Sequence, residues 1–279
     1  MTSIKGFDQY KFPARRSFAI TLQGLDGTGK SSLALSAPGD IAYLFTERSA
    51  DHLKINGVPV VDMPNVHPFE IPYSFGYRKT IDLVEGVRIN DAYKEQLTVD
   101  ELNEQILAWE YFQSLYSASL DWEQCADPFV VIDSMSTVYK SARLAINGRL
   151  EKVRGRDYGP VNESMEQLVY EAAKASGKTV IFLNRLKEKW VNDTNTGMHV
   201  IDGYSQTRFA SHVVVECRYD YKTKTYAQVI DKCVDDATLN GEQLYMGDTY
   251  APHPTHGGDI AGLLTMLGVD VEDTGVGDA

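Results

Sequence analysis

The stretch "LQGLDGTGKSSLALSAPG", residues 22–39, decides the fold of this chain. Its Gly24, Gly29, Lys30 and Ser31 follow the spacing GxxxxGK and then Ser or Thr, which is typical of a phosphate-binding loop. The β-forming run "SFAITLQ" precedes the motif and the helix-forming run "SSLALSA" follows its GK pair. Because a phosphate-binding loop joins a strand to a helix, this context favours nucleotide binding over the alternative, a plain glycine-rich turn.

The residue types of this loop match the chemistry of a polyphosphate. Phosphates bind where backbone N–H groups and a helix N-terminus converge, and glycines allow that backbone to approach them closely. Lys30 is predicted to reach the β- and γ-phosphates, and the Ser31 hydroxyl to ligate Mg²⁺. We therefore expect ATP and Mg²⁺ as cofactors. The predicted nucleotide-binding residues are Gly24, Leu25, Asp26, Gly27, Thr28, Gly29, Lys30, Ser31 and Ser32.

Composition limits the classes of protein to consider. The chain has 279 residues, 43% of them hydrophobic, which suffices for one large α/β domain. Its cysteines, Cys125, Cys217 and Cys233, are few and widely spaced, as expected for reduced thiols in a cytosol. A signal peptide and a membrane span of about 18 apolar residues are both missing from the sequence, so we expect a soluble cytoplasmic protein with no membrane partner. The net charge of −12 repels nucleic acid at long range, so any DNA site must be local.

Apolar runs predict a mostly parallel sheet. Buried strands are expected at residues 41–46 ("IAYLFT"), at 128–132 before Asp133, and at "TVIFLN", with residues 58–63 as a further candidate. Helical segments separate them, and this alternation is typical of an α/β fold. Two β-rich runs on either side of "YKTKT" predict a C-terminal antiparallel hairpin.

Helix signals complete the outline. Pro38 stops the first helix within about two turns, and Thr98 with Glu101 three residues later forms a capping box that begins a long helix. That helix carries an aromatic stripe, Trp109, Tyr111, Phe112 and Tyr116, which we interpret as core. A later helix is expected to end at Gly177, and "DIAGLLTMLG" supplies a closing helix.

The domain organisation is simple. Residues 64–97 suit an edge hairpin or a surface insertion better than a central strand. We expect a single domain over residues 1–265, with an insertion at about residues 64–125, and an acidic flexible tail at residues 266–279.

Hydrolysis of a nucleotide requires acidic groups beside the loop. Asp133 ends a buried strand, at the edge of a parallel sheet where ligands bind, so it is a candidate for holding Mg²⁺. The alternative is a strand-end Asp that caps the next turn. Residues 134–136 offer no Glu for activating water, so the candidate base is Glu47, which follows the strand at residues 41–46.

These motifs carry a resemblance to a known family. In this order, "YLFTER", "VVIDS" and "TVIFLNRLKEKW" resemble the RecA-type recombinase core. The stretch "GTGKSSLALSAPGDIAYLFTE" is similar to the small RecA-core ATPases of bacteriophages, which are thought to act with single-strand annealing or single-strand-binding proteins. The resemblance covers roughly residues 16–235 outside the expected insertion. It implies a RecA-like P-loop core, with a mostly parallel central sheet flanked by helices, that forms a ring or filament of identical subunits.

The resemblance also implies roles for individual residues. It assigns Glu47 to water activation, Asp133 to the metal and Asn184 to sensing of the γ-phosphate. Arg185 departs from the Gln or His that such proteins commonly have there, and its charge is expected either to stabilise the transition state or to point to solvent. Lys232 is implied to reach the nucleotide of a neighbouring subunit, the alternative being a solvated surface lysine. The implied catalytic residues are therefore Lys30, Glu47, Asn184, Arg185 and Lys232.

Two stretches lie where the family places its DNA loops. The first, "ARLAINGRLEKVRGRDYGP", is a basic island, and the second, "RLKEKWVNDTNTGMHVIDGYSQTR", is a long polar loop with Trp190 and Tyr204 for base stacking. The alternative for both is a solvated surface. The expected DNA contacts are Arg149, Lys152, Arg154, Arg156, Lys187, Lys189 and Trp190.

The function expected from these observations is that of a Mg-ATP-dependent, RecA-like ATPase. It would assemble on single-stranded DNA and assist phage homologous recombination or strand annealing in the host cytoplasm. One alternative is a nucleoside monophosphate kinase, since "GLDGTGKSS" is also similar to thymidylate kinase loops. Another is a nucleotide-switched binding module with little hydrolysis.

Overall fold

The computed structural model describes residues 17–46, 53–55, 57–71, 97–148, 150, 154–174, 177–234, 240–241, 243–246 and 259–266. The strands are β1 (Phe18–Gly24), β2 (Ile41–Phe45), β3 (Lys54–Ile55), β4 (Val58–Pro59), β5 (Val66–Glu70), β6 (Phe129–Asp133), β7 (Thr179–Val191), β8 (Thr194–Ile201), β9 (Val213–Asp220), β10 (Thr225–Cys233) and β11 (Gln243–Met246). The helices are α1 (Lys30–Ala34), α2 (Val99–Leu120), α3 (Met135–Asn147), α4 (Gly159–Lys174), α5 (Thr207–Ala210) and α6 (Ile260–Met266), with 3₁₀ turns η2 (Val60–Asp62) and η3 (Gly155–Tyr158).

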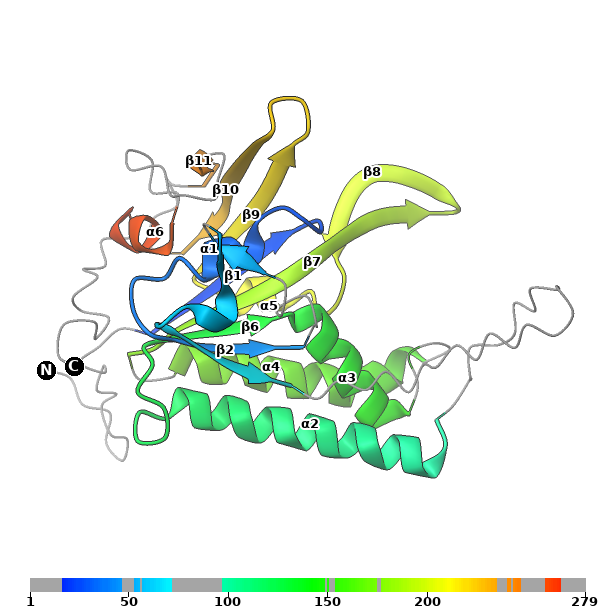
Figure 1. Cartoon of the computed structure of the whole chain (residues 1–279). Coiled ribbons are helices and arrows are strands. Elements are labelled where there is room, and N and C mark those ends of the chain that lie inside the picture. Colours follow the sequence, from blue (N-terminus) through cyan, green and yellow to red (C-terminus); the bar gives the residue numbers. More distant parts are fainter. Residues whose placement is uncertain are drawn as a thin grey trace, which may run out of the picture.

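A nine-stranded sheet forms the centre of the molecule, in the order β11-β10-β9-β1-β7-β6-β2-β5, with β8 paired to β7 (Figure 1). The six strands from β9 to β5 in this order are parallel, and β10 and β11 continue the sheet as antiparallel strands. The predicted α/β architecture is therefore confirmed: a mostly parallel central sheet with flanking helices and antiparallel strands toward the C-terminus.

The two faces of the sheet have separate cores, because side chains alternate along each strand. On one face, Ile20 and Leu22 of β1 pack with α1 and α6. On the other face, Val180 and Phe182 of β7 pack with α2, α3 and α4. Figure 1 shows these three long helices together on one side of the sheet.

Helix α2 begins as its sequence predicts. Thr98 and Glu101 form the capping box, in which the Glu101 N–H donates to Thr98 Oγ1 and the Thr98 N–H donates to the Glu101 carboxylate. Three of its four aromatic side chains are core, with ring centroids 5.5 Å apart for Trp109 and Phe112 and 5.9 Å for Phe112 and Tyr116. Tyr111 is exposed instead, so its assignment to the core was wrong. It lies between buried positions of the helix and faces solvent.

Some of the segments expected to be strands or loops have a different secondary structure. Residues 58–63 were expected as a strand, but only Val58–Pro59 pair, with Lys54–Ile55, before the η2 turn. Pro59 has no N–H to donate to a longer ladder. The described part of residues 64–97 contains β5, a parallel strand at the edge of the sheet beside β2, and residues 72–96, where a hairpin or insertion was expected, lie outside the described residues. Most of the acidic tail lies outside the described residues.

The polar segment after Asn184 was expected as a loop, and this is wrong. It is a β-hairpin, because β7 continues to Val191 and β8 returns antiparallel to it. Asn192 and Asp193 make the turn at φ values of 48° and 60°, a left-handed conformation that these two residue types tolerate better than most. We call this β7–β8 hairpin the arm; it projects from the sheet in Figure 1.

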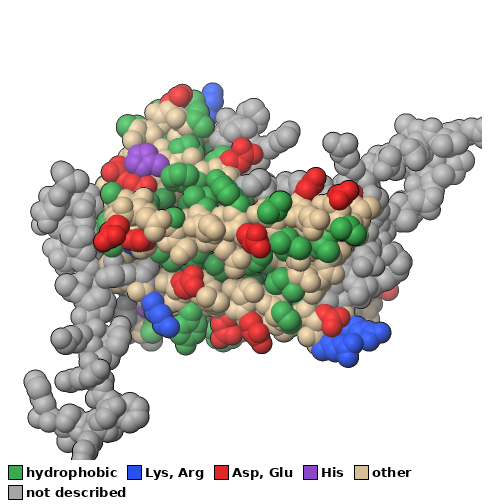
Figure 2. All heavy atoms as spheres, turned by 90° about the horizontal axis from the view of Figure 1, so that it is seen from below, with side chains coloured by type: hydrophobic (Ala, Val, Ile, Leu, Met, Phe, Trp, Pro, Cys, Tyr) green, Lys and Arg blue, Asp and Glu red, His purple; other side chains and the backbone are tan. Residues whose placement is uncertain are grey.

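Figure 2 views the molecule from the side of the long helices, where acidic side chains are scattered and few Lys or Arg are visible. Helix α2 contains four acidic residues and no basic one, and α4 contains three acidic residues and one lysine. Within the described chain, no helix combines the length and apolar character needed to cross a membrane. The three cysteines are free thiols.

Candidate nucleotide-binding site

The predicted phosphate-binding loop lies at the carboxyl end of β1 and leads into α1. Gly27 and Gly29 have positive φ angles of 75° and 83°, and Gly29 is the N-cap of α1. A Cβ on Gly27 would meet no atom within 4 Å, so this part of the loop is open. A Cβ on Gly24 would lie 2.5 Å from the Cys217 carbonyl oxygen of β9, so this glycine is required by the sheet. Helix α1 has five residues, as short as predicted.

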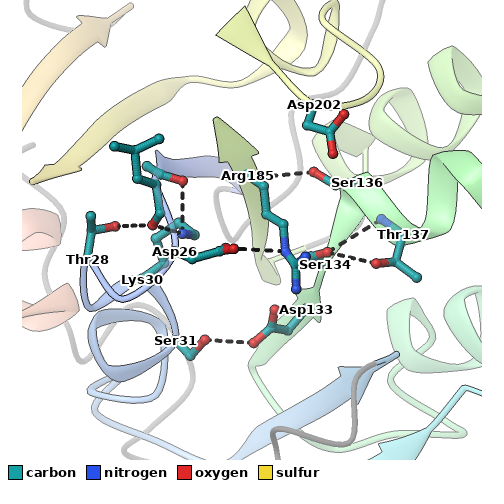
Figure 3. Close-up of polar contacts among 12 residues, drawn as sticks. Asp26, Thr28, Lys30, Ser31, Asp133, Ser134, Ser136, Thr137, Arg185 and Asp202 are labelled. Atoms are coloured by element: carbon teal, nitrogen blue, oxygen red, sulfur yellow. Dashed lines mark hydrogen bonds and ion pairs between the residues drawn. The ribbon is translucent and has the colours of Figure 1, made fainter. Parts of the chain in front are cut away.

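The Lys30 ammonium lies over the loop. Its Nζ donates to the carbonyl oxygens of Gly24 at 2.9 Å and Leu25 at 2.6 Å (Figure 3). Burial lowers the pKa of Lys30, and this effect outweighs nearby negatively charged groups such as Asp26, which would raise it. Burial also raises the pKa of the neighbouring Cys217 thiol to about 12. Thr28 secures the loop by donating to the Leu25 carbonyl at 2.8 Å, and Ser32 is buried in α1.

Ser31 and Asp133 meet beside the loop. The Ser31 hydroxyl donates to Asp133 Oδ2 at 2.7 Å, and the Tyr43 hydroxyl of β2 donates to the same oxygen at 2.9 Å. Strand β6 carries Asp133 on the face of the sheet that holds α1, which explains why the two side chains converge (Figure 3). A hydroxyl and a carboxylate in this position are the oxygen ligands that Mg²⁺ prefers.

Arg185 rather than Asn184 faces the loop. Its Nε lies 3.6 Å from Asp26 Oδ1, and its backbone N–H donates to Ser136 Oγ at 3.0 Å (Figure 3). Asn184 is fully buried, and its amide has no hydrogen-bond partner in the described part of the chain. Side chains alternate between the two faces of the sheet along β7. Asn184 therefore lies on the same face as Val180 and Phe182, away from the phosphate-binding loop.

Lys232 binds the end of α5. Its Nζ donates to the carbonyl oxygens of Arg208, Phe209 and Ser211 at 2.8–3.0 Å. Burial, with a smaller effect of Arg208, lowers the pKa of Lys232. To reach a nucleotide on another subunit, this ammonium would have to leave those three carbonyls.

The candidate base, Glu47, lies outside the described residues. Thr46, the residue before it, donates its N–H to the Asp133 carbonyl at 2.7 Å and accepts from the Ser134 N–H through Oγ1 at 3.2 Å. Strand β2 therefore ends against Asp133, with β2 and β6 adjacent in the sheet.

The basic island is only partly described. Arg149 and Lys152 lie outside the described residues. Arg154 and Arg156 are exposed at η3, where Arg156 Nε lies 3.4 Å from Asp157 Oδ1. The Arg143 guanidinium lies over the rings of Tyr139 and Tyr158, so it already makes cation–π contacts within the fold.

The arm carries the second set of predicted DNA contacts. Lys187 forms an ion pair with Asp202 at 2.8 Å, and Lys140 of α3 forms another at 3.0 Å. Burial alone would raise the pKa of Asp202, but hydrogen bonds from these two lysines hold it below its usual value. Lys189 is half-buried and Trp190 is 59% exposed.

Tyr204 was expected to stack on bases, and the structure contradicts this. It is only 6% exposed and lies near Tyr139, with ring centroids 6.2 Å apart. Its place in the core beside α3 follows from the hairpin, which returns the chain to the sheet before residue 204.

Sequence reasoning missed Tyr43. The signal was a hydroxyl-bearing side chain two residues before the end of the otherwise apolar strand "IAYLF". Its contact with Asp133 could not be predicted without knowing that β2 and β6 are neighbours.

A comparison with solved structures finds a likeness to the crystal structure of the RadB recombinase. It covers 85% of this chain and 90% of that chain, with a TM-score of 0.47 and 15% sequence identity. A likeness at this level carries no conclusion about function. Among curated proteins no significant match was found.

A protein-family profile described as "AAA domain" matches residues 16–235. The match includes the phosphate-binding loop, Asp133, Arg185 and Lys232, and it spans most of the 279 residues. The chain therefore belongs to the AAA domain family.

Proposed function

We propose that this protein is a Mg-ATP-dependent, RecA-like ATPase that assembles on single-stranded DNA and assists phage homologous recombination or strand annealing. The observation that carries the ATP part is the convergence of Ser31 and Asp133, 2.7 Å apart, beside an open glycine loop with Lys30 over it. A bare turn requires none of these three features.

The residues present fit ATP and Mg²⁺. The loop N–H groups and the N-terminus of α1 would hold the phosphates, with Lys30 moving from its two carbonyl acceptors to the β- and γ-phosphate oxygens. Ser31 and Asp133 would hold the metal, Asp133 through water. When bound, Mg²⁺ offsets negative charge on the phosphate oxygens.

Three further residues complete the proposed machinery. Glu47 is proposed to orient and deprotonate the attacking water. Arg185, which already lies against the loop at Asp26, is proposed to stabilise charge on the γ-phosphate. Lys232 is proposed to act on the nucleotide of a neighbouring subunit, which would make hydrolysis depend on assembly into a ring or filament.

DNA binding is proposed at the arm and the basic island. Trp190 is exposed on the arm, and Lys187 and Lys189 lie on the same strand. Aromatic side chains with lysines are the usual means of binding single strands without sequence preference. A phage single-strand annealing or single-strand-binding protein is the proposed partner.

The test is ATP hydrolysis with and without single-stranded DNA, measured together with mass in solution. The wild-type chain should release phosphate faster when DNA is present, in a complex larger than one subunit. Lys30→Ala should remove ATP binding and turnover, whereas the control Lys54→Ala, an exposed lysine on β3, should keep both.

Three results would count against the proposal. Phosphate transfer to a nucleoside monophosphate would indicate a kinase, and ATP binding without turnover would indicate a nucleotide-switched binding module. A turnover rate that Lys30→Ala leaves unchanged would remove the loop from the mechanism.

A further inference from the structure

The β9–β10 hairpin ends in a cluster of tyrosines. Tyr219 and Tyr226 face each other across the two strands, with ring centroids 4.7 Å apart. Tyr221, in the turn, sets its ring perpendicular to Tyr219 at a centroid distance of 4.8 Å and an angle of 89°. Tyr226 also packs against the core, so the cluster is anchored at its base. Tyr221 is nevertheless 81% exposed.

The turn at this tip is held by its own backbone. The Asp220 carboxylate accepts the N–H groups of Lys222 at 2.8 Å and Thr223 at 3.4 Å, and the Asp220 carbonyl accepts the N–H of Lys224 at 2.7 Å. The hydrogen bond from the Lys222 N–H is the main cause that lowers the pKa of Asp220. The carboxylate is therefore directed into the turn, and neither Lys222 nor Lys224 forms an ion pair with a described carboxylate.

The tip shares one feature with the arm. Each hairpin presents one exposed aromatic residue, Trp190 or Tyr221, and two lysines close to it in sequence. The arm extends β7 and the tip extends β9, and these are the two parallel neighbours of β1. Because β1, β7 and β9 are parallel, both hairpins leave the sheet at the edge that carries the phosphate-binding loop (Figure 1).

We propose that the β9–β10 tip, made of Tyr219, Tyr221, Lys222, Lys224 and Tyr226, is a second binding site for single-stranded nucleic acid. Tyr221 stacks on a base, Tyr219 and Tyr226 fix its ring, and the two lysines contact phosphates on either side. Charge favours this occupant, because the tip presents two lysines on a chain whose net charge is −12. The inference rests on the proposed DNA-binding function and assigns to it a region that the sequence did not indicate.

The experiment measures binding of a fluorescent thymidine oligonucleotide by anisotropy, with Mg²⁺ and a non-hydrolysable ATP analogue. Tyr221→Ala should weaken binding about 5- to 150-fold, the range for loss of one stacked base, and Tyr221→Phe should restore it. Replacing Lys222 and Lys224 together by Gln should lower the slope of log affinity against log salt by about 1.4, because each phosphate contact on a single strand contributes about 0.7. The matched control is Tyr111→Ala, an exposed tyrosine on α2, which should bind as the wild type does.

A second measurement identifies the contact directly. An oligonucleotide with bromodeoxyuridine, irradiated in the complex, should crosslink to the peptide that contains Tyr221.

The outcomes separate this inference from the proposed function. If Trp190→Ala weakens binding and Tyr221→Ala does not, the tip is no DNA site while the DNA-binding function stands. If the wild-type chain binds no single-stranded DNA, the proposed function itself fails. If Tyr221→Ala lowers the mass of the protein in solution without DNA, the tip is a contact between copies of the chain, and the inference is overturned.

Discussion

The carboxyl edge of the sheet and the layer of long helices differ in their side-chain chemistry. The edge holds the glycine loop, Lys30 and two hairpins that present aromatic residues and lysines. The helix layer, which consists of α2, α3 and α4, holds seven acidic residues against three basic ones (Figure 2). Acidic composition therefore need not exclude nucleic acid, because the charge is unevenly distributed over the molecule. Substitutions on either side of the molecule test this difference.

The largest effect is expected at the edge, from Asp133→Asn. This change removes the negative charge that Ser31 and Tyr43 contact, so Mg²⁺ should be held poorly and turnover should fall by about 100-fold or more. Phosphate release as a function of Mg²⁺ concentration measures it. Asp62→Asn, an exposed acid in η2, is the control and should hydrolyse at the wild-type rate. Equal Mg²⁺ dependence in the two variants would exclude Asp133 from the metal site.

Two glycines of the loop should respond differently to alanine. Gly24→Ala places a Cβ 2.5 Å from the Cys217 carbonyl oxygen, which is backbone and cannot swing away, so the free energy of unfolding should fall by about 1–3 kcal/mol. The Cβ of Gly27→Ala meets open space, so only the positive φ disfavours alanine there. The free energy of unfolding should fall by about 1 kcal/mol. Urea titrations of both variants measure the difference. If Gly27→Ala lowered the free energy of unfolding more than Gly24→Ala does, the result would contradict the close approach of β1 to β9.

Tyr43→Phe should act on the metal with little effect on the fold. It deletes a hydroxyl donor to Asp133 Oδ2 and leaves the ring in the core, so the Mg²⁺ concentration for half-maximal nucleotide binding should shift by about 3- to 10-fold. Fluorescent ATP-analogue binding at varied Mg²⁺ measures this shift. Binding of the same analogue without Mg²⁺ should stay unchanged, and a loss there would show a general structural defect.

The smallest effect is expected on the helix layer. Changing Glu104 and Glu110 of α2 to Gln should alter affinity for single-stranded DNA by less than about twofold, because charges more than a Debye length from the bound strand are largely screened. Anisotropy at about 0.15 M salt is the measurement. A tenfold gain in affinity for single-stranded DNA would indicate that the strand binds next to this helix layer rather than at the carboxyl edge of the sheet.

Local patterns predicted much of the molecule. The loop, the short α1, the capping box of α2 and the strand that ends in Asp133 each depend on residues close together in the chain. Such features are encoded by spacing and by start and stop signals, so the sequence alone suffices for them.

Features that depend on strand order were less accessible. The contact of Tyr43 with Asp133 requires β2 beside β6, and the approach of Gly24 to Cys217 requires β9 beside β1. The arm was mistaken for a loop because its β8 strand contains Gly197 and polar residues, and both of its faces are largely exposed, so no alternation of buried and polar side chains marks it. The positions of Arg185 and Asn184 depend on strand alternation, and a shift of one residue exchanges the two.

Strand β7 is 13 residues long and runs from the interior of the sheet to the end of the arm. Arg185 and Trp190 lie on this one strand, five residues apart, and a strand rises about 3.3 Å per residue, so about 17 Å separates them. The chain between them is paired to β8, with a register shift between Glu188 and Trp190. One continuous strand therefore joins the residue beside the phosphate-binding loop to the exposed aromatic residue of the arm.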